Sequence, residues 1–154
     1  MLKYIEVSHP EALDWLKTNN LYDDEFHKSF DYWLQHIFLC RRQFPQLKKF
    51  IKSDPRWLAA YLDDKIIAVY YFTVTDKEMF DGYLISHPDY SKYRAGLKLG
   101  KELLKYTQGM WSTNWSTCIE KYVKFNIKLG YEVVGDPFIS KKYSTKIYLL
   151  RRVL

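Results

Sequence analysis

The segment from Asp81 to Tyr131 most constrains what this chain can fold into. Residues 81–86 have the composition of a short strand ending before Pro88, and a basic stretch with spaced glycines follows at 92–101. A helical pattern begins in that stretch, and a second strand and a second helix come after it. The first N–H groups of a helix are unpaired, the helix dipole favours anions there, and glycine lets a backbone approach a ligand closely. The segment therefore predicts a phosphate-binding site at a helix N-terminus.

Upstream of this segment the sequence predicts two helices and a hairpin. Leu2–Val7 alternates as a first strand, and Ser8 begins a helix with the serine, proline and glutamate of a capping box. A longer helix is predicted to start at Asp23-Asp24 and to bury one apolar stripe. The stripe consists of Phe26, Phe30, Trp33, Leu34, Ile37 and Phe38. Trp57–Leu62 and Lys65–Val74, separated by two aspartates, predict an antiparallel hairpin.

Downstream, the sequence predicts a short strand, a helix and two closing strands. The strand is expected at Met110–Thr113, and the helix is expected to begin with the capping-box pattern at 117–120 and to continue to Leu129. Gly130 is placed for a helix C-terminal cap. Tyr131–Val134 and Lys146–Leu150 are expected as strands. The complete order is β-α-α-β-β-β-α-β-α-β-β, an α/β (α+β) fold in a single domain over residues 1–154.

Composition limits the class of protein and its partners. Hydrophobic residues make up 47% of the chain and aromatic residues 18%, which excludes a disordered protein. The net charge of +6 favours polyanionic partners, among them nucleic acid and the phosphates of a cofactor. The chain has two cysteines and no apolar stretch near the roughly 20 residues of a membrane span. We expect a soluble cytoplasmic protein without a membrane partner, and without a metal because its histidines and cysteines lack ligand spacing.

The order of elements and the residues around the glycines resemble the GCN5-related N-acetyltransferase (GNAT) family. The resemblance rests on Pro88, on the run Arg94-Ala95-Gly96-Leu97-Lys98-Leu99-Gly100-Lys101-Glu102-Leu103-Leu104, and on Lys128-Leu129-Gly130-Tyr131. It implies a mixed, mostly antiparallel twisted sheet with helices on both faces and with strands four and five splayed apart. It also implies acetyl-CoA as a co-substrate in that gap. In size and aromatic content the chain is also similar to small acetyltransferase-like proteins of tailed bacteriophages.

The resemblance assigns two segments to the cofactor. The strand Leu84-Ile85-Ser86 would pair through its main chain with the pantetheine arm of acetyl-CoA. The pyrophosphate would be held by Arg94, Ala95, Gly96, Leu97, Lys98, Leu99, Gly100 and Lys101. The family's loop is Arg or Gln, two residues, Gly, one residue, then Gly or Ala. Gly100 fits this register, but Lys98 stands at the first glycine and Ala95 at the Arg or Gln, unless a one-residue insertion brings Arg94 and Gly96 there.

The resemblance also implies an acid and a base. In the family a tyrosine four residues before the Gly-aromatic pair often protonates the departing CoA thiolate, and this position is Asn126, which we assign to the cofactor. Tyr122, one helical turn earlier, is the candidate acid, with a packing role as the alternative, and Tyr131 and Tyr143 are weaker candidates. Asp81 is the candidate base, with Glu78 as the other local carboxylate, although a carboxylate at a strand start is more often a solvated turn residue.

Three functions follow from these observations. The first is an acetyl-CoA-dependent N-acetyltransferase in which a primary amine of a small molecule or protein attacks the thioester directly in a ternary complex. The second is a catalytically inactive GNAT-like binding or structural protein, and the third is a nucleic-acid-binding module that uses the basic residues of 92–101. The chain would be a monomer or homodimer. The acceptor would lie against aromatic residues of the first two helices and the final hairpin, namely Tyr22, Phe26, Trp33, Tyr143 and Tyr148.

Overall fold

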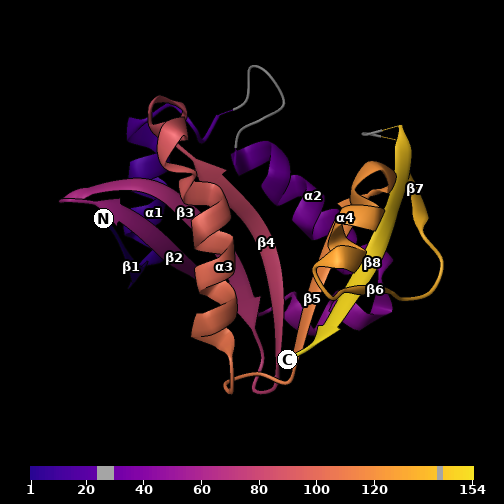
Figure 1. The fold of residues 1–154 in the computed structure, drawn as a ribbon. Coiled ribbons are helices and arrows are strands. Elements are labelled where there is room, and N and C mark those ends of the chain that lie inside the picture. Colours follow the sequence, from indigo (N-terminus) through magenta and orange to yellow (C-terminus); the bar gives the residue numbers. More distant parts are fainter. Residues whose placement is uncertain (24–29, 142–143) are drawn as a thin grey trace.

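The computed structural model describes residues 1–23, 30–141 and 144–154. Its strands form one sheet in the order β1-β2-β3-β4-β5-β8-β6, with β7 paired to β8 (Figure 1). They are β1 (Leu2–Val7), β2 (Pro55–Leu62), β3 (Lys65–Val74), β4 (Glu78–Ser86), β5 (Thr113–Ile119), β6 (Glu132–Val133), β7 (Phe138–Ser140) and β8 (Thr145–Val153). The pairings are antiparallel except that of β4 with β5, which is parallel. The predicted mixed, mostly antiparallel sheet is confirmed.

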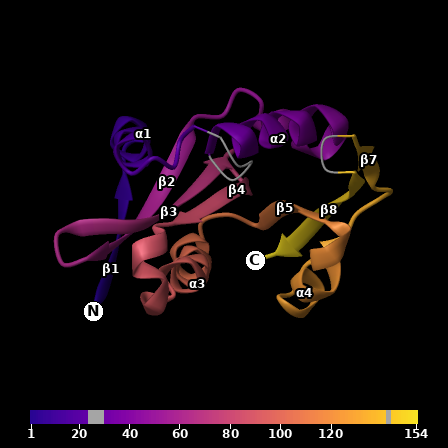
Figure 2. The ribbon, with the colours of Figure 1, turned by 90° about the horizontal axis from the view of Figure 1, so that it is seen from above.

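Helices cover both faces of this sheet, as predicted. Figure 2 shows α1 (His9–Thr18) and α2 (Phe30–Gln43) on one face, and α3 (Ala95–Thr107) and α4 (Val123–Lys128) on the other. Three 3-10 helices, η1 (Pro45–Phe50), η2 (Pro88–Tyr93) and η3 (Glu120–Tyr122), connect these elements. Within the described ranges no helix is long and apolar enough to cross a membrane.

The first two helices form largely as their sequences predict. The Ser8 hydroxyl accepts the N–H of Glu11 at 3.2 Å, which is the predicted cap of α1. In α2, Phe30 and Ile37 are buried as predicted. Phe38 is not: it is 45% exposed. The predicted helix start at Asp23-Asp24 and the stripe residue Phe26 fall at the edge of or outside the described residues.

The two faces of the sheet carry separate cores. The core beneath α1 and α2 includes Leu16, Phe30, Ile37, Cys40, Leu47, Phe50, Trp57, Tyr71 and Phe80. The core beneath α3 includes Leu58, Ile67, Ala68, Phe72, Met79, Ala95, Leu99 and Leu103. Because residues of β2, β3 and β4 alternate between these two cores, the central strands are fixed in register from both sides.

The fifth strand differs from its prediction. The capping-box pattern at 117–120 does not start a helix there: Thr113–Ile119 forms β5, which pairs with β8 from Thr113 opposite Val153 to Ile119 opposite Ile147. Pairing with a strand distant in sequence outweighs the local capping preference. The predicted helix is shorter and begins at Val123, and Gly130 ends it as predicted, with φ +94°.

Candidate active site

The candidate site is the gap where β4 and β5 separate. The two strands pair only from Glu78 opposite Thr113 to Phe80 opposite Trp115, whereas β3 pairs with β4 as far as Ser86. Figure 1 shows the two strands diverging beyond that point. A strand directs alternate N–H and C=O groups to its two sides. The groups of residues 81–86 that face β5 therefore have no strand partner in the described sheet.

A bulge in β4 lies at the point of divergence. Tyr83 pairs with Tyr71 and Asp81 with Phe72, so Gly82 has no opposite residue in β3. A Cβ atom on Gly82 would lie 2.4 Å from Cδ1 of Tyr71 and 3.0 Å from Cδ1 of Ile37. Only glycine fits without a shift of these buried side chains, and the bulge changes the direction of the backbone where β5 departs.

Asp81, next to the bulge, belongs to a buried polar cluster. It is 7% exposed, so the solvated-turn interpretation is wrong. The Tyr131 hydroxyl donates to Oδ2 of Asp81 at 2.9 Å, and it accepts from Nδ2 of Asn114 at 2.9 Å and from Nη2 of Arg152 at 3.1 Å. These four residues come from β4, the segment after α4, β5 and β8, and together they join the two halves of the sheet.

Burial changes the pKa values of the ionisable groups in this cluster. Burial raises the pKa of Asp81 above its usual range, although hydrogen bonds from Ser116, Tyr131 and Asn114 and the charge of Arg152 oppose this rise. Burial and the charge of Asp81 also raise the pKa of Tyr131, which therefore stays a neutral phenol at neutral pH. Oδ1 of Asn114 is buried without a hydrogen-bond partner in the described structure. The cluster thus contains a carboxyl group whose pKa is raised by burial, and Oδ1 of Asn114 can accept one more donor.

The N-terminus of α3 lies beside the free end of β4. A Cβ atom on Gly96 would be 3.6 Å from Cδ2 of Leu84 and 3.7 Å from Oγ of Ser86. The structure therefore brings together the strand and the glycine that the sequence assigns to one ligand. Ile85, between the two strand residues, points into the core beneath α1 and α2, so its contribution to a ligand in the gap is restricted to its main chain.

Most of the segment that the sequence assigns to a phosphate-binding loop is helical, because α3 already begins at Ala95. Arg94 has the left-handed conformation, with φ 50° and ψ 39°, and α3 begins directly after it without a side-chain cap. The N–H of Lys98 bonds to the Arg94 carbonyl at 3.1 Å, so the main chain of Lys98 is occupied within the helix. Leu99 packs in the core, and Gly100 faces Tyr70. The N–H groups that precede the helical ladder belong to Ala95, Gly96 and Leu97.

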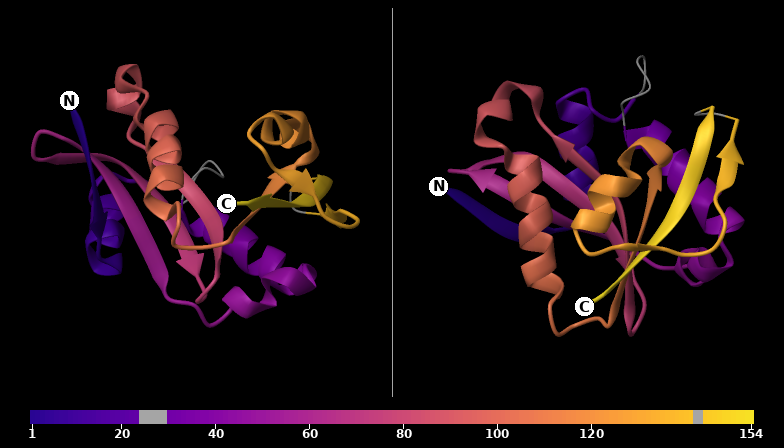
Figure 3. Two further views of the ribbon diagram at one scale, coloured as in Figure 1. Left: turned by 60° about the horizontal axis from the view of Figure 1, so that its bottom comes forward. Right: turned by 45° about the vertical axis from the view of Figure 1, so that its right-hand side comes forward.

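The remaining predicted residues are mostly exposed. The side chains of Arg94, Lys98 and Lys101 are exposed. Tyr122, in η3, is 48% exposed rather than packed, and its carbonyl accepts Nδ2 of Asn126 at 2.9 Å. Among the described residues no contact joins Tyr122 to the Asp81 cluster. The right panel of Figure 3 shows α3 and α4 standing on the two sides of the gap.

The opposite face of the gap is covered by α2. Trp33 stacks on Tyr83 of β4, with ring centroids 5.2 Å apart and an angle of 21° between the rings. Tyr22 packs against Phe30, and the Tyr148 hydroxyl donates to Glu120 at 3.3 Å. Of the aromatic residues expected near an acceptor, Phe26 and Tyr143 lie outside the described residues.

Sequence reasoning did not assign Asn114, Ser116 or Arg152 to the site, and it ranked Tyr131 low. The available signals were the Gly130-Tyr131 pair and the alternation of Asn114 and Ser116 along one strand. Both signals indicate the site only when β5 is known to extend from Thr113 to Ile119. The strand was predicted to end at Thr113, which left these residues in a connection.

Comparisons with known proteins find similar solved structures but no match to a family model or a curated protein. The structure is similar to an acetyltransferase of the GNAT family from Streptococcus pneumoniae (17% identity, TM-score 0.62, covering 100% of this chain and 99% of the other). It is also similar to the ribosomal-protein-S18-alanine N-acetyltransferase from Escherichia coli, with 12% identity and a TM-score of 0.63, covering 99% of this chain and 94% of the other. A third similar structure is an acyl-CoA N-acyltransferase from Pseudomonas aeruginosa, with 12% identity and a TM-score of 0.61, covering 99% of each chain.

These three proteins are bacterial, and nothing in the comparisons supports a bacteriophage origin. Their sequences have diverged far from this one, so the likeness concerns the fold. It extends along both chains almost completely. The chain thus has the fold of the GNAT family of N-acetyltransferases along its whole sequence.

Proposed function

We propose that the protein is an N-acetyltransferase that uses acetyl-CoA as co-substrate and binds it in the gap between β4 and β5. The observation that carries the proposal is the end of β4-β5 pairing at Phe80, directly before the Gly82 bulge. Beyond it, main-chain groups of β4 are available to a ligand that carries amide groups, as the pantetheine arm does. Such a ligand would add to the free edge in the way that a peptide strand does.

The pyrophosphate of acetyl-CoA would lie at the start of α3. The N–H groups of Ala95, Gly96 and Leu97 precede the helical ladder, and the helix dipole adds positive potential there. The exposed side chains of Arg94 and Lys98 would supply charge at the same end, and that of Lys101 lies about one turn further along α3. Because a Cβ atom on Gly96 would lie only 3.7 Å from Oγ of Ser86, the proposed phosphate and pantetheine sites would adjoin each other.

In the proposed reaction an acceptor amine attacks the thioester carbonyl carbon. A C–N bond forms and the C–S bond breaks. The amine proton passes to Asp81, and the departing thiolate takes a proton from the exposed Tyr122 hydroxyl. Orientation of the two reactants, and N–H groups at the bulge that stabilise the oxyanion, would supply most of the rate. Asp81 suits the role of base because its raised pKa brings it closer to neutral pH.

The acceptor is proposed to be a primary amine on a small molecule or a protein. It would approach from the face covered by α2, where Trp33 stacks on Tyr83 beside the bulge. Acetyl-CoA and acceptor would then meet from opposite sides of the sheet. This arrangement fits direct transfer in a ternary complex, because no covalent intermediate on the protein is needed.

Calorimetric titration tests the proposal. The protein is titrated with acetyl-CoA, desulfo-CoA and ADP at two salt concentrations. We expect micromolar binding of acetyl-CoA, weaker binding of ADP, and a part of the affinity that survives high salt because it comes from pantetheine. No binding of acetyl-CoA would reject the proposed site. Affinity that depends on charge alone, and disappears with salt, would indicate the nucleic-acid-binding alternative.

Binding alone does not separate an enzyme from an inactive relative. Release of free CoA thiol is therefore measured with a panel of primary amines and amine-bearing peptides. Acceptor-dependent release is the expected result. Tight acetyl-CoA binding with no release above the rate of hydrolysis for any acceptor would favour the catalytically inactive GNAT-like protein.

A further inference from the structure

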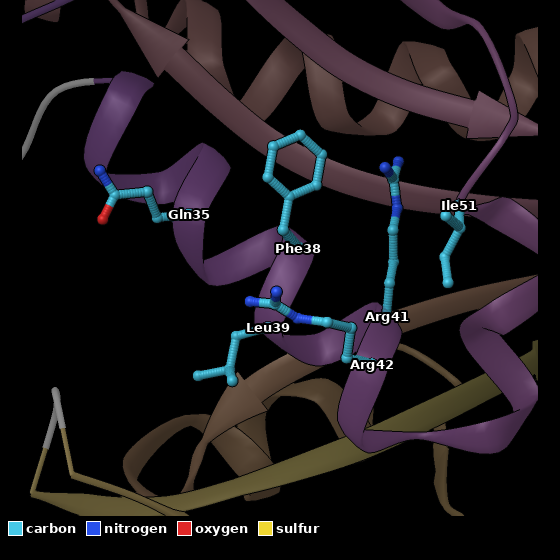
Figure 4. A pocket seen from close by; sticks show the side chains of 6 residues that line it. All are labelled: Gln35, Phe38, Leu39, Arg41, Arg42 and Ile51. Atoms are coloured by element: carbon cyan, nitrogen blue, oxygen red, sulfur yellow. The ribbon is translucent and has the colours of Figure 1, made fainter.

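A groove on the α2 face of the molecule is separate from the acyl-CoA gap. It has a volume of about 550 Å³ and is lined by Gln35, Phe38, Leu39, Arg41, Arg42 and Ile51 (Figure 4). Five of these residues belong to α2, which lies on the opposite side of the sheet from α3 and α4 (Figure 2). The groove is therefore distinct from the space where acetyl-CoA would bind.

Arg41 gives this groove a positive charge that lies near the rings of Phe38 and Phe80 but has no paired carboxylate among the described residues. Its side chain is only 3% exposed, and Nη2 donates to two neutral oxygens, the Tyr71 hydroxyl at 3.4 Å and the Thr73 hydroxyl at 3.2 Å. Its Nε is buried without a hydrogen-bond partner. Across the part of the chain that the structure describes, no carboxylate forms an ion pair with it. Buried cations in proteins are normally paired, because an unpaired one is costly to desolvate.

The walls of the groove are apolar and accessible. Phe38 is 45% exposed and Ile51 50% exposed, although both are large hydrophobic residues. The Arg41 guanidinium lies 5.7 Å from the centre of the Phe38 ring, so the charge and the apolar wall adjoin each other. Arg42 is exposed and adds a second positive charge to the same lining. The groove thus combines two cations with an apolar surface.

We propose that this groove binds a small organic carboxylate, with its anionic group on Arg41, its apolar body against Phe38 and Ile51, and Arg42 adding positive charge to the lining. A planar guanidinium matches a carboxylate in geometry, and pairing would compensate the buried charge. The volume lies within the range of small-molecule sites, roughly 300–1,000 Å³. The inference does not depend on acetyl-CoA binding.

The test uses hexanoate as the probe and hexan-1-ol as the matched uncharged molecule. Both are titrated into the protein while backbone amide signals are followed by NMR. We expect saturable binding of hexanoate in the millimolar range or tighter, with shifts concentrated at residues 35–42 and 51, and binding of hexan-1-ol at least about tenfold weaker. Equal affinity for the alcohol, no saturable binding, or shifts confined to 84–86 and 95–97 would overturn the proposal.

Three substitutions test the charged and the apolar parts of the proposed site. Arg41→Met keeps the length of the side chain, and it is expected to weaken hexanoate binding about tenfold or more. Its melting temperature is measured beside the affinity, because the buried Tyr71 and Thr73 hydroxyls lose a donor. Arg42→Gln and Phe38→Ala, both at exposed positions, are each expected to weaken binding about threefold, and they carry the test if Arg41→Met does not fold. Arg151→Met is the control, because Arg151 also lies near an aromatic ring, at 5.7 Å from that of Trp115, but is paired with Glu132. Wild-type affinity in all three groove variants would reject the site.

Discussion

The Tyr131 hydroxyl donates a 2.9 Å hydrogen bond to the Asp81 carboxylate, which joins two residues 50 positions apart. Asp81 lies on β4, and Tyr131 follows α4 on the half of the sheet that contains β5 and β8. The bond therefore connects the two halves of the molecule where β4 and β5 separate. It also opposes the rise that burial causes in the pKa of Asp81, the residue that we propose as base.

Tyr131→Phe is expected to lower the free energy of unfolding by about 2–3 kcal/mol. The phenol oxygen bonds to Asp81, Asn114 and Arg152 at once, so its loss leaves two buried polar groups and the half-buried Arg152 with one partner fewer. Urea denaturation measures the effect. Tyr148→Phe is the control, because its hydroxyl bonds only to the exposed Glu120 among the described residues, and it should cost less than about 0.5 kcal/mol. Equal effects of the two substitutions would show that the cluster does not stabilise the fold.

Gly82→Ala and Gly100→Ala are expected to change stability in opposite directions. The Cβ atom at position 82 would meet Cδ1 of Tyr71 at 2.4 Å, and this clash should cost about 1–3 kcal/mol. At position 100, within α3, the nearest atom is Cε2 of Tyr70 at 3.9 Å. Alanine there should stabilise by about 0.5–1 kcal/mol, because glycine is a poor helix former. Thermal unfolding compares the two, and a Gly82→Ala variant as stable as the wild type would contradict the bulge geometry.

The double substitution Arg94→Ala with Lys98→Ala is expected to weaken acetyl-CoA binding about tenfold or more with little change in stability. Both side chains are exposed at the start of α3, where the phosphates would lie. Calorimetric titration measures the affinity. Lys48→Ala with Lys52→Ala, also exposed, removes the same charge from another part of the surface and should leave the affinity nearly unchanged. Equal affinities in the two double variants would remove the phosphate site from our proposal.

The stability of the protein is expected to depend on pH through Asp81. Burial raises the pKa of this carboxyl above its ordinary value of 3.8, so the folded protein binds the proton more tightly than the unfolded chain does. The stabilising contribution of the protonated group is complete below pH 3.8 and is lost as the pH rises through the raised pKa. Relative to the wild type, Asp81→Asn should therefore gain stability with increasing pH across this window.

Denaturant unfolding at a series of pH values measures this difference. Asp76→Asn, at an exposed turn, is the control for the loss of one negative charge. A constant difference between the wild type and Asp81→Asn at all pH values would contradict the raised pKa. If Asp81 is the base, kcat/KM should also fall on the acid side at a higher pH than for an ordinary aspartate.

Features that depend on neighbouring residues were predictable from the sequence. The β2-β3 hairpin follows from two β-branched and aromatic runs around Asp63-Asp64, and the start of α1 follows from the Ser8 cap. The glycine cap at Gly130 belongs to the same class. Each of these patterns is complete within about a dozen residues, so the sequence alone contains the interaction that forms it.

Only the tertiary structure decided the site. The extent of β5 depends on its pairing with β8, and this pairing, not the local capping pattern, sets where the chain is extended. The Gly82 bulge requires Tyr71, and the burial of Asp81 requires Tyr131, Asn114 and Arg152 from three other elements. The unpaired charge of Arg41 likewise appears only when α2 is packed on the sheet. The sequence determined which local elements form, whereas contacts between distant residues, each dependent on burial, determined how they build a site.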